Sequence, residues 1–494
     1  MAQLYQLHIH SRDYSKYSLV SENQTIDLDQ PSLIHDLFHN DIVHYDPNGP
    51  IIKLHKRDDF PKTIAGELEL YSKYSFKPNK KGVPTYIFTP LDFHYPKFLV
   101  SSTLKRNREF NQYITIEYSH WDKISVFPKG QIVKIYGNIN DKKALQEVLI
   151  SKHFLENKCI KHDFKGTLSQ MKILQSNVTN RDIISSKMIS IDPEGCTDID
   201  DAFSIGKQSD ILTLDIHISD VYYLLTNLDL LSKVNNSTSI YLQDSIQPML
   251  PTIISNNLGS LLEGQYRFML SLEIKYSILN KKVLSTRIRP TYGKITKNYS
   301  YENYPKRIDK FFPIVQELYK CITEQELVVS DSHFFIEALM IIYNTMFCKK
   351  LQEVAFTIYR IQTKQTIVQP DATGLEEEAP LCQFLKLIHS HGAKYSLDKK
   401  GHSTLGIRDY THATSPLRRM VDLMNQEIFY THKSTLLERI SLDYMNEYNR
   451  RLKRCYREIG KIILGYNVYY GSSYQSECYL YQYNLEKKYV YLYF

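Results

Sequence analysis

Four acidic side chains stand close together near the middle of the chain: Asp192, Asp198, Asp200 and Asp201. No lysine or arginine lies between them, and carboxylates this close repel one another unless something positive is bound. Apolar residues such as Ile199 and Phe203 alternate with the acids, so the segment should be partly buried. Because a buried carboxylate without a partner is costly, the spacing predicts a bound divalent cation. Hard oxygen ligands favour Mg²⁺ or Mn²⁺ over zinc.

Two other interpretations of the acidic segment are a solvated turn and a calcium-binding loop. The interleaved apolar residues argue against the solvated turn. In a calcium loop that began at Asp192, Thr197 would stand at the glycine position and Phe203 at the position of the bidentate glutamate. Neither residue type can fill that role, so the register excludes an EF-hand.

A second group of residues suits phosphate chemistry. Ser415 is a good helix N-cap and Pro416 fits the first helical position. This pattern predicts a helix that begins here and places Arg418 and Arg419 in its first turn. Cations are disfavoured at that end of a helix, whereas a helix start with two guanidinium groups binds phosphate well. A surface arginine pair is the alternative.

Regular elements must hold these two groups in place. The pattern predicts a hairpin after the acidic segment, from residues 202–205 and 212–218, with Asp198 and Asp200 on one face and Asp201 on the other. An apolar stripe at helical spacing predicts a helix over residues 333–354. A shorter helix is expected over residues 141–151. Short strands separated by Pro, Gly and Asn predict a small barrel before it, over residues 66–71, 85–89, 113–118 and 130–139.

Two stretches resemble the ribonuclease II (RNB) family of 3′→5′ exoribonucleases, which hydrolyse RNA with Mg²⁺. The first is Ile191-Asp-Pro-Glu-Gly-x-x-Asp-x-Asp-Asp-Ala, and the second is Tyr410-Thr-His-Ala-Thr-Ser-Pro-Leu-Arg-Arg-Met-Val-Asp-Leu. Weaker anchors follow in the family's order, among them Ser255-Asn-Asn-Leu, where Gly259 replaces a cysteine. The segment Phe88-Thr-Pro-Leu-Asp-Phe-His-Tyr-Pro-Lys resembles the second cold-shock domain of the eukaryotic branch.

The resemblance implies roles for particular residues. The four aspartates would hold one or two Mg²⁺ or Mn²⁺ ions, Asp200 would be the acid most tied to catalysis, and Arg418 would neutralise the scissile phosphate. RNA contacts would come from Tyr241, Tyr301, Glu337 and Arg419. Departures from the family pattern include Ala338 for an acid, Ala413 for an aromatic residue, and Met420 for tyrosine.

The implied fold is an α+β RNB catalytic domain preceded by OB-fold, cold-shock-like β-barrel domains. We expect a short β-rich region over residues 1–60, in the place of a reduced cold-shock domain, and an OB domain over 61–150. A connector over 151–183 and the catalytic domain over 184–440 follow. Residues 441–494 would be a basic helix and a short β tail, less than a complete S1 domain, and no PIN domain fits ahead of the barrels. That basic helix is equally consistent with a solvated face and with an RNA track.

Composition limits the remaining classes. The chain of 494 residues is 43% hydrophobic and has a formal net charge of +7, which fits a globular protein and permits nucleic acid as a partner. Its 7 cysteines, an odd number without a Cys-x-x-Cys pair, argue against a zinc site and a disulfide framework and predict a reducing, cytoplasmic location. No signal peptide or membrane span is expected.

The sequence therefore predicts a Mg²⁺-dependent 3′→5′ exoribonuclease that acts as a monomer on single-stranded RNA. An RNA-binding protein with inactive chemistry on the same fold is the main alternative. A DNA exonuclease is the second, because no motif displays a contact to the 2′-hydroxyl.

Overall fold

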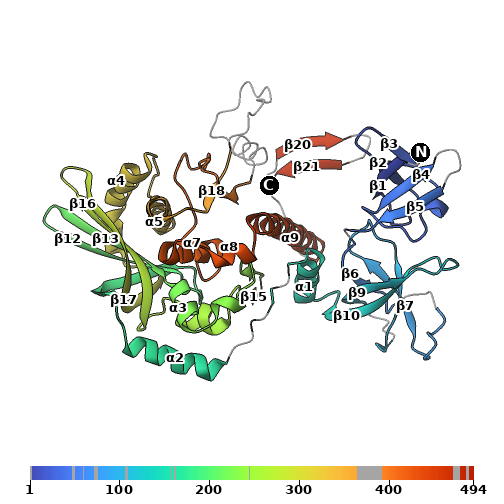
Figure 1. The fold of residues 1–494 in the computed structure, drawn as a ribbon, viewed down its shortest axis with the longest axis horizontal. Helices are drawn as coiled ribbons and strands as arrows, with labels where there is room; N and C mark the ends of the chain where they lie inside the picture. Colours follow the sequence, from blue (N-terminus) through green and yellow to red (C-terminus); the bar gives the residue numbers. More distant parts are fainter. Residues whose placement is uncertain are drawn as a thin grey trace. The chain divides into compact units, whose positions relative to one another are not determined.

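The computed structural model describes residues 3–46, 51–58, 60–71, 76–105, 110–155, 157–158, 160, 163–243, 245–363, 392–470, 479–484 and 489–493. The chain divides into two compact units. The first contains residues 1–156 and 450–470, and the second contains residues 157–449 and 471–494. Figure 1 shows the ribbon of the chain. Each unit has its own buried core. In the described part of the chain, no helix is both long enough and apolar enough to cross a bilayer.

The first unit begins with a five-stranded antiparallel sheet in the order β3-β2-β1-β4-β5. Its strands are β1 (Gln3–Ile9), β2 (Tyr17–Val20), β3 (Thr25–Leu28), β4 (Ile42–Asp46) and β5 (Ile51–Lys56). Alternation of buried and solvent-facing residues places Leu7, Ile9, Leu19 and Val43 in a core of its own.

A closed barrel follows in the order β10-β8-β7-β6-β9, as the pattern of short strands predicts. It consists of β6 (Ile64–Leu68), β7 (Thr85–Pro90), β8 (Phe98–Ser101), β9 (Gln112–His120) and β10 (Lys129–Asn138). The ring of Trp121 touches both cores of this unit. It packs on Tyr14 and His35, which lie in loops of the first sheet, and on Phe38, which belongs to the core of the barrel. Sheet and barrel therefore share a continuous apolar seam.

Helix α1 (Lys142–Lys152) comes directly after the barrel, at the place where the sequence predicts a helix. Asp141 caps it by accepting the N–H of Lys143. The part of α9 (Leu442–Tyr470) that belongs to this unit is tied to α1 by Glu458, which pairs with Lys152 Nζ at 2.7 Å and His153 Nε2 at 2.8 Å. These bonds lower the pKa of Glu458 to about 2, with the hydrogen bond from His153 contributing most.

The second unit is built on another closed barrel, in the order β11-β12-β13-β16-β17. Its strands are β11 (Asp182–Asp192), β12 (Asp201–Gln208), β13 (Ile211–Ser219), β16 (Tyr266–Ser277) and β17 (Lys282–Ser300). Strands β12 and β13 form the predicted hairpin, and β11 closes the barrel by pairing in parallel with β17.

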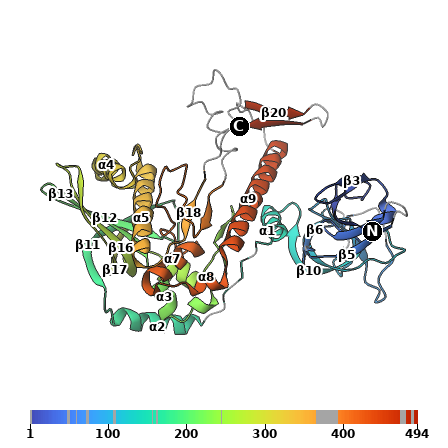
Figure 2. The ribbon, with the colours of Figure 1, turned by 45° about the horizontal axis from the view of Figure 1, so that its top comes forward.

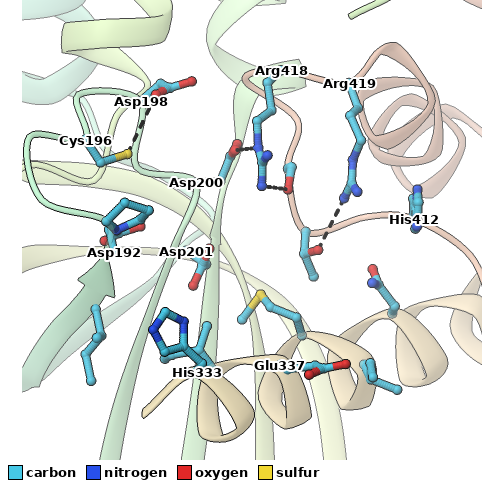
Figure 3. A pocket seen from close by; sticks show the side chains of 18 of the residues that line it. Asp192, Cys196, Asp198, Asp200, Asp201, His333, Glu337, His412, Arg418 and Arg419 are labelled. Atoms are coloured by element: carbon cyan, nitrogen blue, oxygen red, sulfur yellow. Dashed lines mark hydrogen bonds and ion pairs between the residues drawn. The ribbon is translucent and has the colours of Figure 1, made fainter. Parts of the chain in front are cut away.

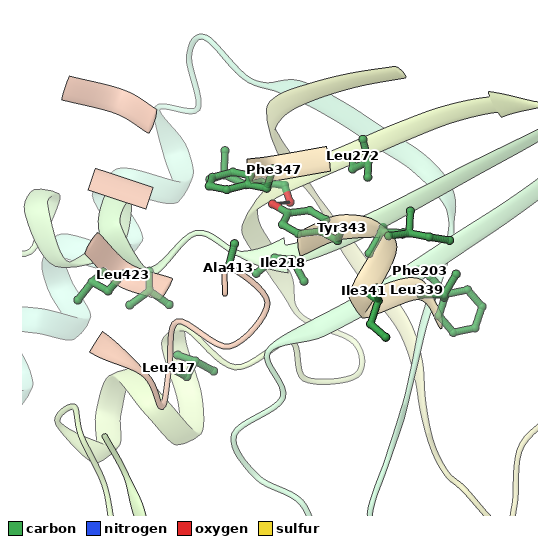
Figure 4. Close-up of a cluster of buried hydrophobic side chains, with 14 of the residues drawn as sticks. Phe203, Ile218, Leu272, Leu339, Ile341, Tyr343, Phe347, Ala413, Leu417 and Leu423 are labelled. Carbon is green, nitrogen blue, oxygen red and sulfur yellow. Dashed lines mark hydrogen bonds between the residues drawn. The ribbon is translucent and has the colours of Figure 1, made fainter. Parts of the chain in front are cut away.

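Helix α5 (Ser332–Val354) packs on this barrel and confirms the helix predicted over residues 333–354 (Figure 2). Its apolar face meets the inward residues of the sheet, so that Phe203 and Phe335 pack edge to face at 5.4 Å between ring centroids. Figure 4 shows this core, where Tyr343 of α5 lies near Ile218 and Leu272 of the strands. The side chains of Ile218, Leu272 and Tyr343 are fully buried, so close packing holds α5 against the barrel.

Shorter elements complete the second unit. They are α2 (Phe164–Ser176), α3 (Val221–Asn227), β14 (Ile240–Tyr241), β15 (Ile246–Gln247), α4 (Phe312–Thr323), β18 (Tyr359–Ile361), β19 (Lys394–Ser396), α7 (Met420–Thr431), α8 (Thr435–Arg439), β20 (Tyr479–Asn484) and β21 (Tyr489–Tyr493). Helix α2 lies within the expected connector over residues 151–183, and it buries only Thr167 and Met171.

Candidate functional site

A cavity of about 610 Å³ in the second unit contains every site residue that the sequence singles out. Figure 3 shows the aspartates on one side, Arg418 and Arg419 facing them, and Glu337 on the helix below. The predicted residues that line it are Asp192, Asp198, Asp200, Asp201, Tyr241, Tyr301, Glu337, Arg418 and Arg419. Residues more than 200 positions apart in sequence therefore meet in one place.

The acidic segment crosses from β11 to β12 along the lining of this cavity. Asp192 is the last residue of β11 and Asp201 the first of β12, while Asp198 and Asp200 lie in the irregular segment between them. The prediction that Asp201 points to the opposite face is wrong, since all four acids line the same cavity. The reason is that strand alternation begins only at Asp201, after the turn.

Asp200 joins the two halves of the site. Its side chain is 3% exposed, and it accepts the backbone N–H of Leu417 at 2.8 Å and Nε of Arg418 at 3.2 Å. Burial raises the pKa of Asp200 to about 7, although Arg418 opposes that shift. Arg418 remains 46% exposed, so part of its guanidinium group is open to the cavity.

Arg418 and Arg419 do not lie in the first turn of a helix as predicted. Residues 416–418 form a turn on Ser415, Arg419 is extended with φ −132° and ψ 123°, and α7 begins at Met420. The helix starts late because Arg419 forms a β-bridge with Thr238, a contact that local sequence does not reveal. The two arginines therefore offer their own charge rather than that of a helix terminus.

Arg419 is committed to a neighbour. Its NH2 donates to Asp422 at 2.7 Å, and the same carboxylate oxygen accepts the N–H of Ser415 at 2.8 Å. Asp422 is fully buried, so this ion pair holds the turn that carries Arg418.

Asp192 and Asp201 carry the charges that best fit a cation. The Oδ2 atom of Asp192 is buried, and none of the described residues donates a hydrogen bond to it. Burial raises the pKa of Asp192 to about 6, and burial together with the charge of Asp192 raises the pKa of Asp201 well above its usual range. A bound cation would offset the cost of charging these two buried groups. Carboxylate oxygens are also the ligands that Mg²⁺ and Mn²⁺ prefer.

The carboxylates of Asp198 and Asp200 form hydrogen bonds with other residues of the chain. Asp198 accepts the hydroxyl of Tyr241 and, at 3.7 Å, the thiol of Cys196, and Asp200 holds Leu417 and Arg418. Within the described residues, no three His, Cys, Asp or Glu side chains are grouped so that they could hold a metal ion. All four aspartates line the cavity, and the set of four ligands stays a prediction.

Two tyrosines flank the acids. Tyr241 is fixed through its bond to Asp198, and burial raises its pKa. Tyr301 donates its backbone N–H to the carbonyl of Asp192 at 3.2 Å, and its ring stacks on His333 with centroids 3.8 Å apart and planes 13° from parallel. Both tyrosines line the cavity, and aromatic rings are the side chains on which bases stack.

Polar residues that the sequence analysis does not select also line the cavity. Asn344 of α5 accepts the N–H of Ala413 at 2.8 Å and thereby ties the 410–415 stretch to the helix. His412 lies against the hydroxyl of Tyr395 at 2.9 Å, and burial together with Arg419 lowers the pKa of His412 well below its usual range. His333, Asn344 and His412 are among the lining residues that sequence reasoning did not select. The position of His412 inside the second motif, and that of Asn344 on the helix that carries Glu337, could have signalled two of them.

Two family models match the chain. The RNB domain matches residues 180–313 and 315–435, slightly more than half of the chain. The Dis3-like cold-shock domain 2 (CSD2) matches residues 85–153, which include β7 to β10 and α1.

Curated relatives agree with these matches. Exosome complex exonuclease RRP44 of Mus musculus is 27% identical over 271 residues, which cover 53% of this chain and 27% of that protein. Ribonuclease R of Thermotoga maritima is 25% identical over 234 residues, which cover 44% of this chain and 32% of that protein. The match thus spans between about a quarter and a third of these relatives' own length.

Two solved structures share the fold. Ribonuclease R of Mycoplasma genitalium, in complex with ribose-methylated single-stranded RNA, has a TM-score of 0.71 at 16% identity and covers 94% of this chain and 87% of that one. Yeast Ssd1, a pseudonuclease, has a TM-score of 0.58 at 13% identity and covers 94% of this chain and 74% of that one. The expected fold, an α+β catalytic domain preceded by an OB-type barrel, is confirmed. Since the matched residues include both the acidic segment and Arg418, the chain belongs to the RNB family.

Proposed function

We propose that this chain is a divalent-metal-dependent exoribonuclease that shortens single-stranded RNA from its 3′ end and releases nucleoside 5′-monophosphates. The observation that carries the proposal is the shared cavity, which brings four carboxylates and the exposed part of Arg418 within one space. The names of its relatives, an exosome exonuclease and ribonuclease R, support the same activity.

The residues divide the work according to their contacts. Asp192 and Asp201, with Asp198 beside them, would hold Mg²⁺ or Mn²⁺. Such a cation supplies Lewis-acid stabilisation of the charge that develops on the phosphate. Asp200 is the buried acid that orients Arg418 toward that charge.

The remaining lining residues would bind the RNA. Tyr241 and Tyr301 offer rings for the terminal bases, and Glu337 offers a carboxylate for ribose hydroxyls. Arg419 adds positive charge behind Arg418, although its bond to Asp422 makes it chiefly a support of the turn.

An RNA-binding protein without hydrolysis is the second candidate. It is favoured by the absence of a three-ligand metal group among the described side chains. The shared fold with Ssd1 shows that the architecture occurs in a pseudonuclease.

The test uses a single-stranded RNA labelled at its 5′ end, a copy labelled in its last nucleotide, and a DNA of the same sequence. With Mg²⁺, the 5′-labelled RNA should shorten gradually, and the other copy should release labelled 5′-monophosphate at once. A chelator should stop both reactions. RNA that is bound but never shortened, with either Mg²⁺ or Mn²⁺, would support the binding protein instead. Equal degradation of the DNA would indicate an exonuclease without selectivity for ribose.

A further inference from the structure

A segment that does not line the cavity bonds to the backbone of the acidic residues. It consists of a π-helical turn, Ile254–Leu258, followed by Gly259, Ser260 and Leu261. Turns of this kind often occur at functional sites. The side chain of Ser260 is fully buried.

The hydroxyl of Ser260 bonds to both neighbours of Asp198. It donates to the carbonyl of Thr197 at 2.8 Å and accepts the N–H of Ile199 at 2.9 Å. One side chain thus fixes the peptide groups on either side of a cavity-lining acid. The N–H of Leu261 adds a bond to the carbonyl of Ile199 at 2.9 Å.

Further contacts extend this support to Asp200. The N–H of Ser219 donates to the carbonyl of Asp200 at 2.9 Å, and the hydroxyl of Ser219 donates to the carbonyl of Gly259 at 2.6 Å. Strands β11 and β12 are paired only at Ile189 and Phe203, so pairing between them does little to hold the acids that connect them. The bonds from this segment supply that support.

The segment is itself held by Arg267, which is 3% exposed. Its Nε donates to the carbonyl of Ser260 at 2.6 Å, and its NH2 donates to the carbonyl of Asn257 at 3.0 Å. A buried charge satisfied by carbonyl groups is costly to displace, so the segment has little freedom to shift.

Gly259 connects the segment to the other half of the site. A Cβ atom there would lie 2.7 Å from Cδ2 of Leu417 and 2.9 Å from the carbonyl oxygen of Ile254. Leu417 is the residue whose N–H holds Asp200, so its close packing on Gly259 also sets the position of the turn that carries Arg418.

We propose that Ser260 is a positioning residue, which orients Asp198 and Asp200 through the backbone of residues 197–199 and so sets the affinity for the divalent cation. The inference rests on the proposed function but concerns a residue that touches neither RNA nor metal. Partners in this outer position typically change metal affinity or activity by about 10- to 100-fold.

The test compares Ser260→Ala with Ser271→Ala in the full chain. Ser271 is also fully buried in the same unit, but its hydroxyl bonds to His217 and Thr291, away from the cavity. Ser260→Ala should weaken Mn²⁺ binding, measured by electron paramagnetic resonance without RNA, by about 10-fold or more. The Ile199 amide should exchange its hydrogen faster, and kcat should fall while KM for RNA changes little. Ser271→Ala should lower the melting temperature but leave Mn²⁺ affinity and kcat near wild type.

Equal losses in the two variants, or a Ser260→Ala protein with full Mn²⁺ affinity and unchanged exchange at Ile199, would overturn the proposal. Should Ser260→Ala fail to fold, Asn256→Ala decides, because Asn256 is exposed and its amide donates to the Thr197 hydroxyl at 2.9 Å. That variant should weaken Mn²⁺ binding in the same direction, and unchanged binding would count against the proposal. The Mn²⁺ and exchange measurements decide even when the wild type hydrolyses no RNA, so failure of the proposed function is recognised separately.

Discussion

The backbone N–H of Leu417 donates to Oδ1 of Asp200 at 2.8 Å, although 217 positions separate the two residues. Through this bond a buried carboxylate of the acidic segment fixes the turn that presents Arg418. The acid and the guanidinium group are therefore one assembly, and a change in either should disturb the other.

Replacement of Asp200 by asparagine should abolish hydrolysis and leave RNA binding nearly intact. An amide keeps one oxygen for the Leu417 N–H but turns an NH₂ group toward Arg418, which is also a donor, so the orientation of Arg418 is lost. Hydrolysis of labelled RNA and the RNA dissociation constant are the measurements. Asp215→Asn is the matched control, since Asp215 is a buried acid that pairs with Arg289 outside the cavity. Hydrolysis near the wild-type rate in Asp200→Asn would remove Asp200 from the chemistry.

Replacement of Arg418 by alanine should lower kcat by about 100-fold or more and change KM much less, because the lost charge acts on the transition state. Arg418→Lys should recover only part of this loss, since a lysine ammonium group is a point charge that lacks the planar, bidentate fork of a guanidinium group. Steady-state kinetics on a short RNA provide both constants. Arg439→Ala is the control, because that guanidinium group donates to backbone carbonyls of residues 231, 232 and 234. A variant with normal kcat and weaker binding would assign Arg418 to substrate binding.

The metal-free protein should lose stability as pH rises from about 4 to 6. Burial raises the pKa of Asp192 to about 6, so in this window the folded state holds a proton that the unfolded chain has released. The free energy of unfolding therefore falls with rising pH, and the full loss, on the order of 2 kcal/mol after solvent screening, is present above pH 6.

Thermal unfolding in the presence of a chelator, compared between wild type and Asp192→Asn, measures this effect. The stability advantage of the variant should grow across that window, and Mg²⁺ at pH 7 should restabilise the wild type alone. Asp398→Asn, at an exposed position, should show the wild-type profile. If the stability of the wild type and that of Asp192→Asn change in parallel with pH, the prediction is contradicted.

The basic face of α9 should contribute to RNA affinity. Arg454, Arg457 and Lys461 are exposed on this helix. Changing all three to glutamine should weaken binding and lower the slope of log affinity against log salt by about 2, given about 0.7 per phosphate on a single strand. Fluorescence anisotropy, measured at salt concentrations from about 50 to about 300 mM, gives the slope. The same change at Lys275, Lys281 and Lys282, exposed around the turn between β16 and β17, is the control. An unchanged slope in the α9 variant would show that this face is merely solvated.

Local pattern was sufficient where an element is held by its own periodicity. Helix α5 begins within one residue of the predicted start, because Asp331 caps it and its apolar stripe is continuous. The acids were found from their close spacing and from the apolar residues between them, because a buried carboxylate without a partner is costly.

The errors arise where distant residues decide. The late start of α7 follows from the bridge between Arg419 and Thr238, and the turn of Asp201 into the cavity follows from the irregular path before β12. Ser260 acts on residues about 60 positions away, and nothing in its neighbourhood in the sequence indicates this.

The chain contains a single tryptophan, Trp121, and its place in the seam of the first unit makes it a natural optical probe. The indole N–H donates to the carbonyl of Ser125 at 3.0 Å, and its ring is partly shielded by Tyr14 and His35. Its fluorescence therefore follows melting of the first unit, whereas circular dichroism follows both units. Emission and dichroism curves that separate on heating would reveal two cooperative transitions in one chain.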